Sequence, residues 1–518
     1  MVLEQLPEHM NFSELIKGIY FIRQAPEISV SGLSLDSRLA QSGDLFFALH
    51  GQKVHGKNFI DEAIKRGVNV VMWASPTPQQ DSREGVPIFG VPGLKEIVGT
   101  IAERFYGSPS SQQWVVGVTG TNGKTSVTQF IAQALHQKTP CGVIGTLGNG
   151  VYGQLNETVF TTPDAVTLHT LLDDMHHDDV NHVVMEVSSH GLEQGRASGV
   201  SFDVAVFTNL SHEHLDYHGD MESYGKAKRR LFESAGLKYA VINIDDDYGR
   251  KLLTSLPAST GTVSYGFAVG TVLPSLLGSD LQLGSSGLRM HVESDWGSAD
   301  LHVPLIGGFN AENILAALGA LLASGIHFDD AVERLQKVSS VSGRMQAYGG
   351  RIIGDHIGDH VVGNERQPLV VVDYAHTPDA LEQVLTTMRQ HTTGKLWCLF
   401  GCGGERDTSK RPLMAAVAER LADRVIISDD NPRNENSQVI IADILQGFKH
   451  ANDVLVIPDR AKAIESLILE VEESDVVLIA GKGHEEVQIV GDQRLPFNDG
   501  KEVEKALALR ARSRGSLS

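Results

Sequence analysis

The stretch that most constrains the fold is residues 114–135, WVVGVTGTNGKTSVTQFIAQAL. Residues 114–118 have the pattern of an apolar strand, and a turn rich in glycine follows. After the turn, apolar residues recur at the spacing of a helix, at Val127, Phe130, Ile131 and Leu135. A strand, a glycine turn and a helix in this order predict an α/β domain.

The residues of the turn indicate what this domain binds. Its glycines would let backbone amides approach a polyphosphate, and the start of the helix adds the positive end of its dipole. Lys124 can reach the outer phosphates, and the Thr125 hydroxyl can ligate Mg2+. Val118 stands where the general phosphate-loop pattern has its first glycine, so an ordinary glycine-rich turn is the alternative. A lysine followed by a threonine at these positions favours an ATP site.

The composition is that of a globular protein with several domains. A length of 518 residues suggests about three domains. No apolar run approaches the ~18 residues of a membrane span, and the start lacks the pattern of a signal peptide, so we expect a cytoplasmic protein. The net charge of -20 opposes non-specific nucleic-acid binding.

The three cysteines support neither a disulfide framework nor a zinc site, and we expect them to be thiols in the core.

The order of patterns along the chain predicts three domains. Residues 1–111 have the pattern of a small α/β domain. Residues 112–341 predict a central, mostly parallel, doubly wound sheet of the P-loop type, with a small antiparallel excursion after residue 255. Residues 342–518 predict a Rossmann-like sheet, although GCGGER in this part does not match a dinucleotide fingerprint. We expect the basic, Ser-rich end of the chain to be frayed.

Two further groups follow strands of the central domain. Glu186 lies near the end of the strand predicted at residues 182–187, where ligands collect in open α/β sheets. An acid at this edge is a natural second anchor for Mg2+. The next strand ends in a segment that contains His212, Glu213, His214, Asp216 and His218. Single histidines often only cap loops, but their place at a strand end favours the site. Lys228 lies on the next helix, where a lysine is usually solvated.

Taken together, the motifs resemble the Mur ligase family. They are GTNGKTS, TTPDA, MEVSSHGLEQGR, FTNLSHEHLDYHGDMESYGKAK, GGFNAEN, SGRM, DYAHTPDAL, FGCGGERDTSKRPLM, DDNPR and AGKGHE, and they occur in the order of the family between about residues 35 and 499. The resemblance implies an N-terminal domain for the UDP end of the substrate, a central ATP domain, and a C-terminal domain that closes over the site with the amino acid.

The resemblance also implies a reaction, in which an ATP-dependent amide ligase adds meso-diaminopimelate to UDP-N-acetylmuramoyl-L-alanyl-D-glutamate in peptidoglycan synthesis. The side-chain carboxylate of D-glutamate attacks the ATP γ-phosphate and forms an acyl phosphate, which an amine then attacks. A carboxylate acylates poorly without such activation, and the two anions can meet only if Mg2+, lysine and backbone amides absorb their charge. The implied partners are these small molecules, and we expect a monomer.

By the same resemblance, the site residues fall into four groups. The ATP phosphates would lie against Gly120, Thr121, Asn122, Gly123, Lys124, Thr125 and Ser126. The nucleotide would also be faced by Asn310, Arg344, Asp373 and His376. The UDP-linked substrate would be held by Leu35, Ser37, Gln52, Lys53, Val54, Thr161, Thr162, Ser188, Gln194 and Arg196. The Mg2+ ligands would be Thr125, Glu186, His214 and Lys228, the last as the N6-carboxylysine that the family carries.

The loop that would select the amino acid is DNPR, made of Asp430, Asn431, Pro432 and Arg433. The resemblance implies that members adding meso-diaminopimelate carry the arginine and those adding L-lysine lack it. A guanidinium can grip the distal carboxylate of meso-diaminopimelate with two parallel hydrogen bonds and would repel the distal ammonium of lysine. Arg406, Gly481 and Glu485 would complete this pocket.

Some features leave alternatives open. SHEH stands where relatives often have an Arg-Asp pair, so the roles of His212 and Glu213 are undecided, and residues 353–367 have the character of an insertion. The alternatives are the same ligase with L-lysine, a folylpolyglutamate synthetase, a phosphotransferase, and a nucleotide-dependent regulatory protein. The presence of Lys124, Glu186, His214 and Lys228 disfavours the last.

Overall fold

The computed structural model describes residues 9–51, 55–158, 160–267, 273–284, 287–341, 343–350, 367–392 and 394–515. The chain divides into two compact units, one of residues 1–275 with 316–326 and one of residues 276–315 with 327–518. None of the helices in the described ranges is both long and apolar enough to cross a membrane.

The first unit begins with a small α/β domain, as the sequence predicts. Its five-stranded sheet has the order β3-β4-β5-β7-β6, and every neighbouring pair is parallel except β6 and β7. The elements are β1 (Met10–Asn11), α1 (Phe12–Ile16), β2 (Ser29–Val30), β3 (Gly32–Ser34), β4 (Asp44–Ala48), α2 (Ile60–Lys65), β5 (Val70–Ala74), β6 (Gln79–Arg83), β7 (Val86–Val91) and α3 (Leu94–Phe105).

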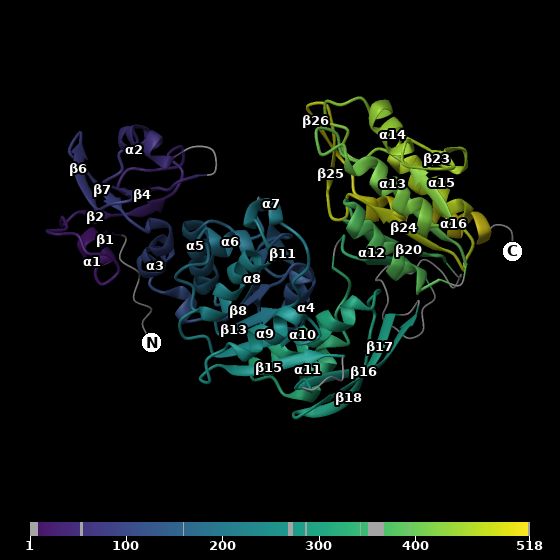
Figure 1. Cartoon of the computed structure of the whole chain (residues 1–518), viewed down its shortest axis with the longest axis horizontal. Helices are drawn as coiled ribbons and strands as arrows, with labels where there is room; N and C mark the ends of the chain where they lie inside the picture. Colours follow the sequence, from purple (N-terminus) through teal and green to yellow (C-terminus); the bar gives the residue numbers. More distant parts are fainter. Residues whose placement is uncertain are drawn as a thin grey trace. The chain divides into compact units, whose positions relative to one another are not determined.

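The central sheet of the same unit is parallel in the order β9-β12-β8-β13-β14-β15, and β10 and β11 extend its edge in antiparallel pairing (Figure 1). Its elements are β8 (Trp114–Thr119), α4 (Lys124–His136), β9 (Cys141–Gly145), β10 (Gly148–Val151), β11 (Gln154–Asn156), α5 (Ala165–His177), β12 (His182–Glu186), α6 (Ser189–Glu193), β13 (Val204–Phe207), α7 (Leu215–His218), α8 (Met221–Arg229), β14 (Tyr239–Asn243), α9 (Asp247–Thr254) and β15 (Gly261–Gly266).

Parallel pairing brings the carboxyl ends of β8, β12 and β13 to one edge of this sheet. The register pairs Glu186 with Val118 and Phe207 with Thr119, so the three strands end almost level. Residues of α5, α9 and the segment after α8 pack on one face, in a core that contains Leu172, Leu231 and Leu252. The phosphate loop, Glu186 and the segment after Phe207 therefore leave the sheet beside each other.

The second unit contains the predicted antiparallel strands and a second α/β sheet. The strands are β16 (Leu276–Gly284), β17 (Gly287–Ser294) and β18 (Gly297–Val303). Helix α10 (Phe309–Ala323) belongs to this unit as far as Leu315, and α11 (Phe328–Leu335) belongs to it entirely. The six-stranded sheet has the order β19-β20-β24-β21-β22-β23 and is parallel except for β19. Its strands are β19 (Gln346–Gly349), β20 (Leu369–Asp373), β21 (Leu396–Phe400), β22 (Arg424–Ile427), β23 (Leu455–Val456) and β24 (Val476–Ala480).

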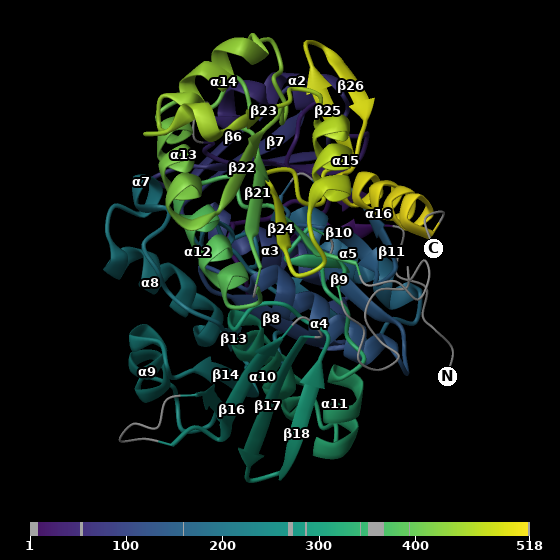
Figure 2. The same cartoon turned by 90° about the vertical axis from the view of Figure 1, so that its right-hand side faces the viewer.

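Helices cover both faces of this second sheet, as Figure 2 shows. Helices α12 (Pro378–Arg389), α13 (Lys410–Leu421) and α14 (Ser437–Leu445) pack on one face, against residues such as Val371 and Cys398. Helices α15 (Arg460–Glu470) and α16 (Asp499–Gly515) pack on the other, against Val372 and Leu399. A hairpin of β25 (Val487–Val490) and β26 (Gln493–Pro496) lies between β24 and α16 in the chain.

Two expectations about the core have clear outcomes. All three cysteines are buried free thiols, as predicted, and burial raises the pKa of each. The prediction that the C-terminal end of the chain is frayed was wrong, because α16 continues to Gly515. Arg510 in this helix is buried and donates from Nη1 to Ile468 O at 2.6 Å. The alanines and leucines of this segment favour a helix, and the buried arginine fixes it to α15.

Candidate functional site

The turn between β8 and α4 forms a tight loop at the sheet edge. Gly123 has φ 85°, and a Cβ at Gly120 would collide with the hydroxyl of Thr208, so both positions need glycine. The segment after β13 pins the loop, because Thr121 N donates to Asn209 O at 2.8 Å and Asn122 N to Asn209 Oδ1 at 2.9 Å. The glycines predicted for close phosphate approach thus lie in a loop whose backbone is fixed.

Lys124 and Thr125 begin helix α4. Lys124 Nζ donates to the carbonyl oxygens of Gly120 and Thr121, both at 2.9 Å, so its side chain folds back over the loop. The Thr125 hydroxyl donates to Glu186 Oε2 at 2.8 Å. The lysine and the helix start give the loop the positive character that a polyphosphate requires.

Glu186 is a buried carboxylate at the end of β12. Its Oε1 accepts from Thr146 N at 2.8 Å, and its Oε2 accepts from the hydroxyls of Thr125 and Thr146. Among the described residues, no group of three or more His, Cys, Asp or Glu could hold a metal ion. Mg2+ takes one or two carboxylates in proteins and fills its other positions with water and substrate phosphates. The oxygens of Thr125 and Glu186 fit such an ion.

Lys228 is buried beside the phosphate loop, although its place on a helix suggested a solvated side chain. Its Nζ donates to Gly120 O at 2.6 Å and lies 4.4 Å from the centroid of the Tyr224 ring. Burial, together with the charge of Lys124, places the pKa of Lys228 well below its ordinary value. Burial and the nearby charge of Lys124 therefore favour the neutral amine of Lys228 over its ammonium.

His214 begins helix α7 in the left-handed conformation, with φ 58°. Its ring lies 4.9 Å from that of His190 and 6.0 Å from that of Tyr224 between centroids. Tyr224 in turn lies 3.2 Å from Thr121 Oγ1, and burial raises the pKa of Tyr224 to about 12. His214 is exposed, as are His212 and Glu213, but its ring contact with Tyr224 connects it to the phosphate loop.

The residues predicted for the muramoyl dipeptide gather around the end of β12. Thr162 Oγ1 donates to Glu186 O at 3.0 Å, and Ser188 caps α6 by accepting from Gly191 N. Arg196 Nη1 donates to Thr162 O at 2.9 Å, and its Nε donates to Gln194 Oε1 at 3.0 Å. Burial lowers the pKa of Arg196. Thr161 Oγ1 lies 3.0 Å from Thr146 Oγ1, so all five predicted residues belong to one polar network beside Glu186.

The predicted uridine residues are described only in part. Ser37 donates from its hydroxyl to Glu62 Oε2 at 2.7 Å, and Leu35 lies beside it in the chain after β3. Gln52, Lys53 and Val54 lie outside the described residues, as does the proposed insertion up to residue 366. The role of this group stays a prediction.

In the second unit, three of the predicted nucleotide residues lie next to β19 and β20, because Arg344 precedes β19, Asp373 ends β20 and His376 follows it. Asp373 ends β20 and accepts from Met345 N and Ala375 N, both at 2.8 Å, and burial raises its pKa. The Arg344 guanidinium lies 5.1 Å from the centroid of the Tyr374 ring, and His376 Nδ1 is 3.0 Å from Tyr374 O.

Asn310, the fourth predicted nucleotide residue, donates to Ile306 O at 2.8 Å and accepts from Asn313 Nδ2 at 3.0 Å. These bonds hold its amide at the start of α10, and its role toward the nucleotide stays a prediction.

The specificity loop leaves the carboxyl end of β22. Arg433 has φ 52°, and two hydrogen bonds hold its backbone, from Arg433 N to Ile489 O at 3.0 Å and from Gly491 N to Arg433 O at 2.8 Å. Its Nη1 donates to Gly404 O at 2.9 Å. The β25–β26 hairpin and the loop that carries Arg406 thus fix the arginine from two sides.

Asn431 and Glu485 are joined directly, because Asn431 Nδ2 donates to Glu485 Oε2 at 2.8 Å. Asp430 is buried, which raises its pKa, and a Cβ at Gly481 would approach Asp430 Oδ2 to 2.7 Å. Gly481 has φ 120°, so a side chain there would be both strained and crowded. The structure therefore brings Asp430, Asn431, Gly481 and Glu485 together, with Arg433 at the end of the same loop.

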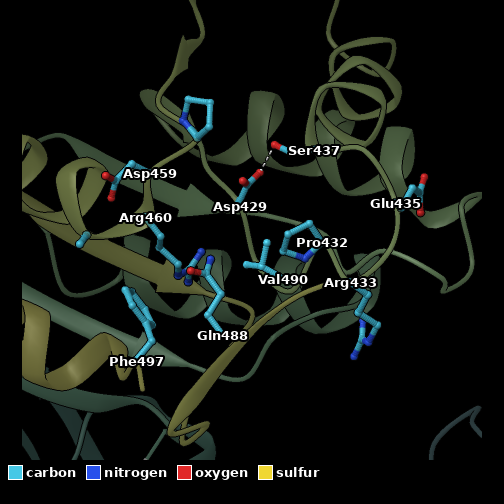
Figure 3. A pocket seen from close by; sticks show the side chains of 12 residues that line it. Asp429, Pro432, Arg433, Glu435, Ser437, Asp459, Arg460, Gln488, Val490 and Phe497 are labelled. Atoms are coloured by element: carbon cyan, nitrogen blue, oxygen red, sulfur yellow. Dashed lines mark hydrogen bonds between the residues drawn. The ribbon is translucent and has the colours of Figure 1, made fainter. Parts of the chain in front are cut away.

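A cavity of about 380 Å³ borders the other side of this loop (Figure 3). Asp429, Ser437 and Arg460 line it together with Pro432 and Arg433, and the Ser437 hydroxyl donates to Asp429. In Figure 3 the side chain of Arg433 points away from Asp429 and Ser437. The specificity loop therefore has open space on one side.

Three buried cations near this loop were missed by sequence reasoning. Lys482 and Arg460 are fully buried, and Arg411 on α13 donates to both oxygens of Glu435 at 2.7 Å. Their sequence context gave no signal, because lysine and arginine on helices or loops are usually solvated. Only the fold shows that they face acids.

Comparisons with known proteins cover nearly the whole chain. Three family models match it: "Mur ligase family, catalytic domain" at residues 29–106, "Mur ligase middle domain" at residues 118–321, and "Mur ligase, glutamate ligase domain" at residues 360–483. The UDP-N-acetylmuramoyl-L-alanyl-D-glutamate--2,6-diaminopimelate ligase of Coxiella burnetii (strain RSA 493 / Nine Mile phase I) is 45% identical over 485 residues, which are 93% of this chain and 96% of the relative.

A second relative and a solved structure agree with this match. The protein of the same name from Pseudomonas aeruginosa PAO1 is 45% identical over 483 residues, 93% of this chain and 96% of the relative. A solved structure of a protein of that name aligns with a TM-score of 0.71 at 36% identity, and the alignment covers 97% of this chain and 99% of the other.

Proposed function

Because the chain belongs to the Mur ligase family, we propose that it is an ATP-dependent ligase that joins meso-diaminopimelate to the D-glutamate side-chain carboxylate of UDP-N-acetylmuramoyl-L-alanyl-D-glutamate. This reaction builds the peptide stem of peptidoglycan precursors. The observation that carries the proposal is the similarity, along 93% of the chain, to relatives that bear the name of this activity. The phosphate loop and the DNPR loop supply the chemistry that this reaction requires.

In the first step, an oxygen of the D-glutamate carboxylate attacks the γ-phosphorus of ATP. A bond forms between these two atoms. The bond between the γ-phosphorus and the oxygen that bridges it to the β-phosphate breaks, and ADP leaves. Lys124 and the start of α4 would stabilise the charge on the phosphates, and hydrogen bonds from the loop to Asn209 already hold the loop in place before the reaction. Thr125, Glu186, His214 and a carbamylated Lys228 would hold Mg2+, which supplies further positive charge at the phosphates when bound.

In the second step, a neutral amine of meso-diaminopimelate attacks the carbonyl carbon of the acyl phosphate. The resulting tetrahedral intermediate expels inorganic phosphate, the nitrogen loses a proton, and an amide bond remains. The polar network around Thr162, Ser188 and Arg196 lies beside Glu186, so it is well placed to orient the substrate carboxylate next to the phosphate loop.

The burial of Lys228 supports its carbamylation. Lys228 is 1% exposed, its Nζ donates to Gly120 O at 2.6 Å, and the charge of Lys124 lowers its pKa further. Reaction of its neutral amine with CO2 forms an N–C bond and releases one proton, which converts the side chain into an anionic carbamate. An anion at this position would be attracted to Lys124 and to a metal ion, whereas the ammonium is repelled.

The amino-acid pocket supports the choice of meso-diaminopimelate. Arg433 can pair with the distal carboxylate, and Glu485 can accept a hydrogen bond from an ammonium of the substrate. L-Lysine lacks that carboxylate and keeps only the distal ammonium, which the guanidinium would repel. We also propose that the enzyme acts as a monomer in the cytoplasm, with these small molecules as its partners.

The test is phosphate release by the full chain with UDP-N-acetylmuramoyl-L-alanyl-D-glutamate, ATP and Mg2+, in parallel reactions with meso-diaminopimelate and with L-lysine. The proposal predicts release that depends on meso-diaminopimelate. Phosphate release with L-lysine but not with meso-diaminopimelate would support the ligase reaction and contradict the role of Arg433. Release without any amine would indicate a phosphotransferase, and no release in any reaction would contradict the ligase.

A further inference from the structure

Lys482 lies at the centre of the amino-acid pocket, yet it is shielded from solvent. It follows Gly481 in the loop after β24, and its side chain is 0% exposed. An ammonium has three donors and no acceptor. All three donors have partners, namely Asn431 Oδ1 at 3.0 Å, Glu485 Oε2 at 2.8 Å and Val487 O at 2.8 Å. The ammonium therefore joins the specificity loop, the loop after β24 and the β25–β26 hairpin.

The partners of Lys482 are also bonded to each other. Asn431 Nδ2 donates to Glu485 Oε2 at 2.8 Å, and Asn431 Oδ1 accepts from Ile489 N at 2.9 Å. Lysine, asparagine and glutamate thus form a closed triangle of hydrogen bonds. In such a triangle the amide of Asn431 can adopt one orientation only, because its oxygen faces two donors and its nitrogen faces a carboxylate.

The two carboxylate oxygens of Glu485 have different surroundings. Oε2 accepts from both Lys482 and Asn431. Within the part of the chain that the structure describes, Oε1 makes no hydrogen bond, and the side chain of Glu485 is 29% exposed. One oxygen is thereby fixed to the protein, and the other is available to an ammonium group.

We propose that Lys482 is a positioning residue of the amino-acid pocket, which fixes Asn431 and Glu485 so that Glu485 Oε1 receives the ammonium of the incoming amino acid. The proposal rests on the ligase function proposed above and deepens it. Lys482 itself does not contact the substrate in this account, because it is buried behind the two residues that it holds. Its charge also offsets part of the charge of Glu485, which keeps the carboxylate from binding any cation indiscriminately.

The central variant is Lys482→Met, which keeps most of the length and apolar volume of the stem and removes the ammonium. Without it, Glu485 keeps only the hydrogen bond from Asn431. We expect the KM for meso-diaminopimelate to rise about 10- to 100-fold, as a misplaced binding group predicts. The KM values for ATP and for the UDP-linked substrate should stay unchanged. The matched control is Lys505→Met, which removes an exposed lysine of α16 from the same unit.

A double-mutant cycle separates positioning from a merely structural role. If Lys482 acts through Glu485, Lys482→Met should raise the KM for meso-diaminopimelate strongly in the native background and only slightly in the Glu485→Gln background. Equal effects in both backgrounds would overturn the proposal, as would a parallel rise of all three KM values. If Lys482→Met does not fold, Lys482→Arg keeps the charge but moves the donors, and the same selective rise in one KM is expected.

The same experiment distinguishes failure of this inference from failure of the ligase function. An unaltered chain that does not use meso-diaminopimelate would refute the function, whatever the variants do. An unaltered chain that is active, together with a Lys482→Met variant whose KM for meso-diaminopimelate is unchanged, would refute the positioning role alone.

Discussion

The replacement Arg433→Met tests the selection of the amino acid at a single side chain. The change removes the guanidinium and leaves the backbone hydrogen bonds of this residue, to Ile489 O and from Gly491 N, in place. Met at φ 52° carries the same backbone strain as Arg, so the fold of the loop should survive. The effect of the variant can therefore be attributed to the lost side chain.

The magnitude follows from the hydrogen bonds of the guanidinium. Nη1 donates to Gly404 O at 2.9 Å, while Nε and Nη2 make no hydrogen bond within the described residues. These two groups can donate in parallel to one carboxylate. A hydrogen bond to a charged group contributes about 1.5–3 kcal/mol, and each 1.4 kcal/mol is about tenfold. Because two such hydrogen bonds are lost, we expect kcat/KM for meso-diaminopimelate to fall at least about 100-fold.

The assay is phosphate release with meso-diaminopimelate and, at high concentration, with L-lysine, which has no distal carboxylate. Turnover of L-lysine should stay at its low level or rise, because a repulsive charge is removed. Arg424→Met at the exposed start of β22 is the control and should change neither. An equal loss with both amino acids, or no loss with meso-diaminopimelate, would refute the reasoning.

Three further replacements test other parts of the account. Lys228→Ala should nearly abolish phosphate release, and a short carboxylic acid added to the assay should restore part of it by replacing the carbamate. Glu186→Gln should lower kcat/KM at least about tenfold and raise the Mg2+ concentration needed for half-maximal rate, because the Thr125–Glu186 pair loses its charge. Asp499→Ala leaves the buried Arg460 guanidinium without its carboxylate partner, and should lower the free energy of unfolding by about 3–5 kcal/mol in denaturant titrations.

Each of these variants has a control and a result that would contradict it. Lys226→Ala removes an exposed lysine of the same helix, and full activity of unrescued Lys228→Ala would exclude the carbamate role. Glu157→Gln is the control for Glu186→Gln, because Glu157 is exposed. An unchanged Mg2+ dependence of Glu186→Gln would show that Glu186 is not a ligand of the metal ion. Asp300→Ala loses only a surface pair with His291, and equal stability of Asp499→Ala and Asp300→Ala would show that the buried pair contributes little.

The strands and helices were largely predictable because their patterns are local. The apolar strand before Gly120 is β8, and the helix predicted after the glycine turn is α4. The alternation of strands and helices also predicted the parallel sheets, which place Glu186 at the same edge as the phosphate loop. These features depend on residues close together in the sequence and on a general rule about parallel strands.

Burial of charged side chains could not be predicted in the same way. Lys228, Lys482 and Arg510 each have the local context of a solvated residue, but the fold places acceptors from distant segments around them. Gly120 O and Lys228 Nζ are 108 residues apart in the chain and 2.6 Å apart in space. The pairing depends on how β8 and α8 pack, which no local pattern records.

Product identity in a competition reaction tests the central claim most directly. The full chain is incubated with UDP-N-acetylmuramoyl-L-alanyl-D-glutamate, ATP, Mg2+ and equal amounts of meso-diaminopimelate and L-lysine, and the nucleotide products are identified by mass spectrometry. The account predicts one product, heavier than the substrate by one diaminopimelate less one water. A product carrying lysine, or an unchanged substrate with ATP consumed, would contradict it.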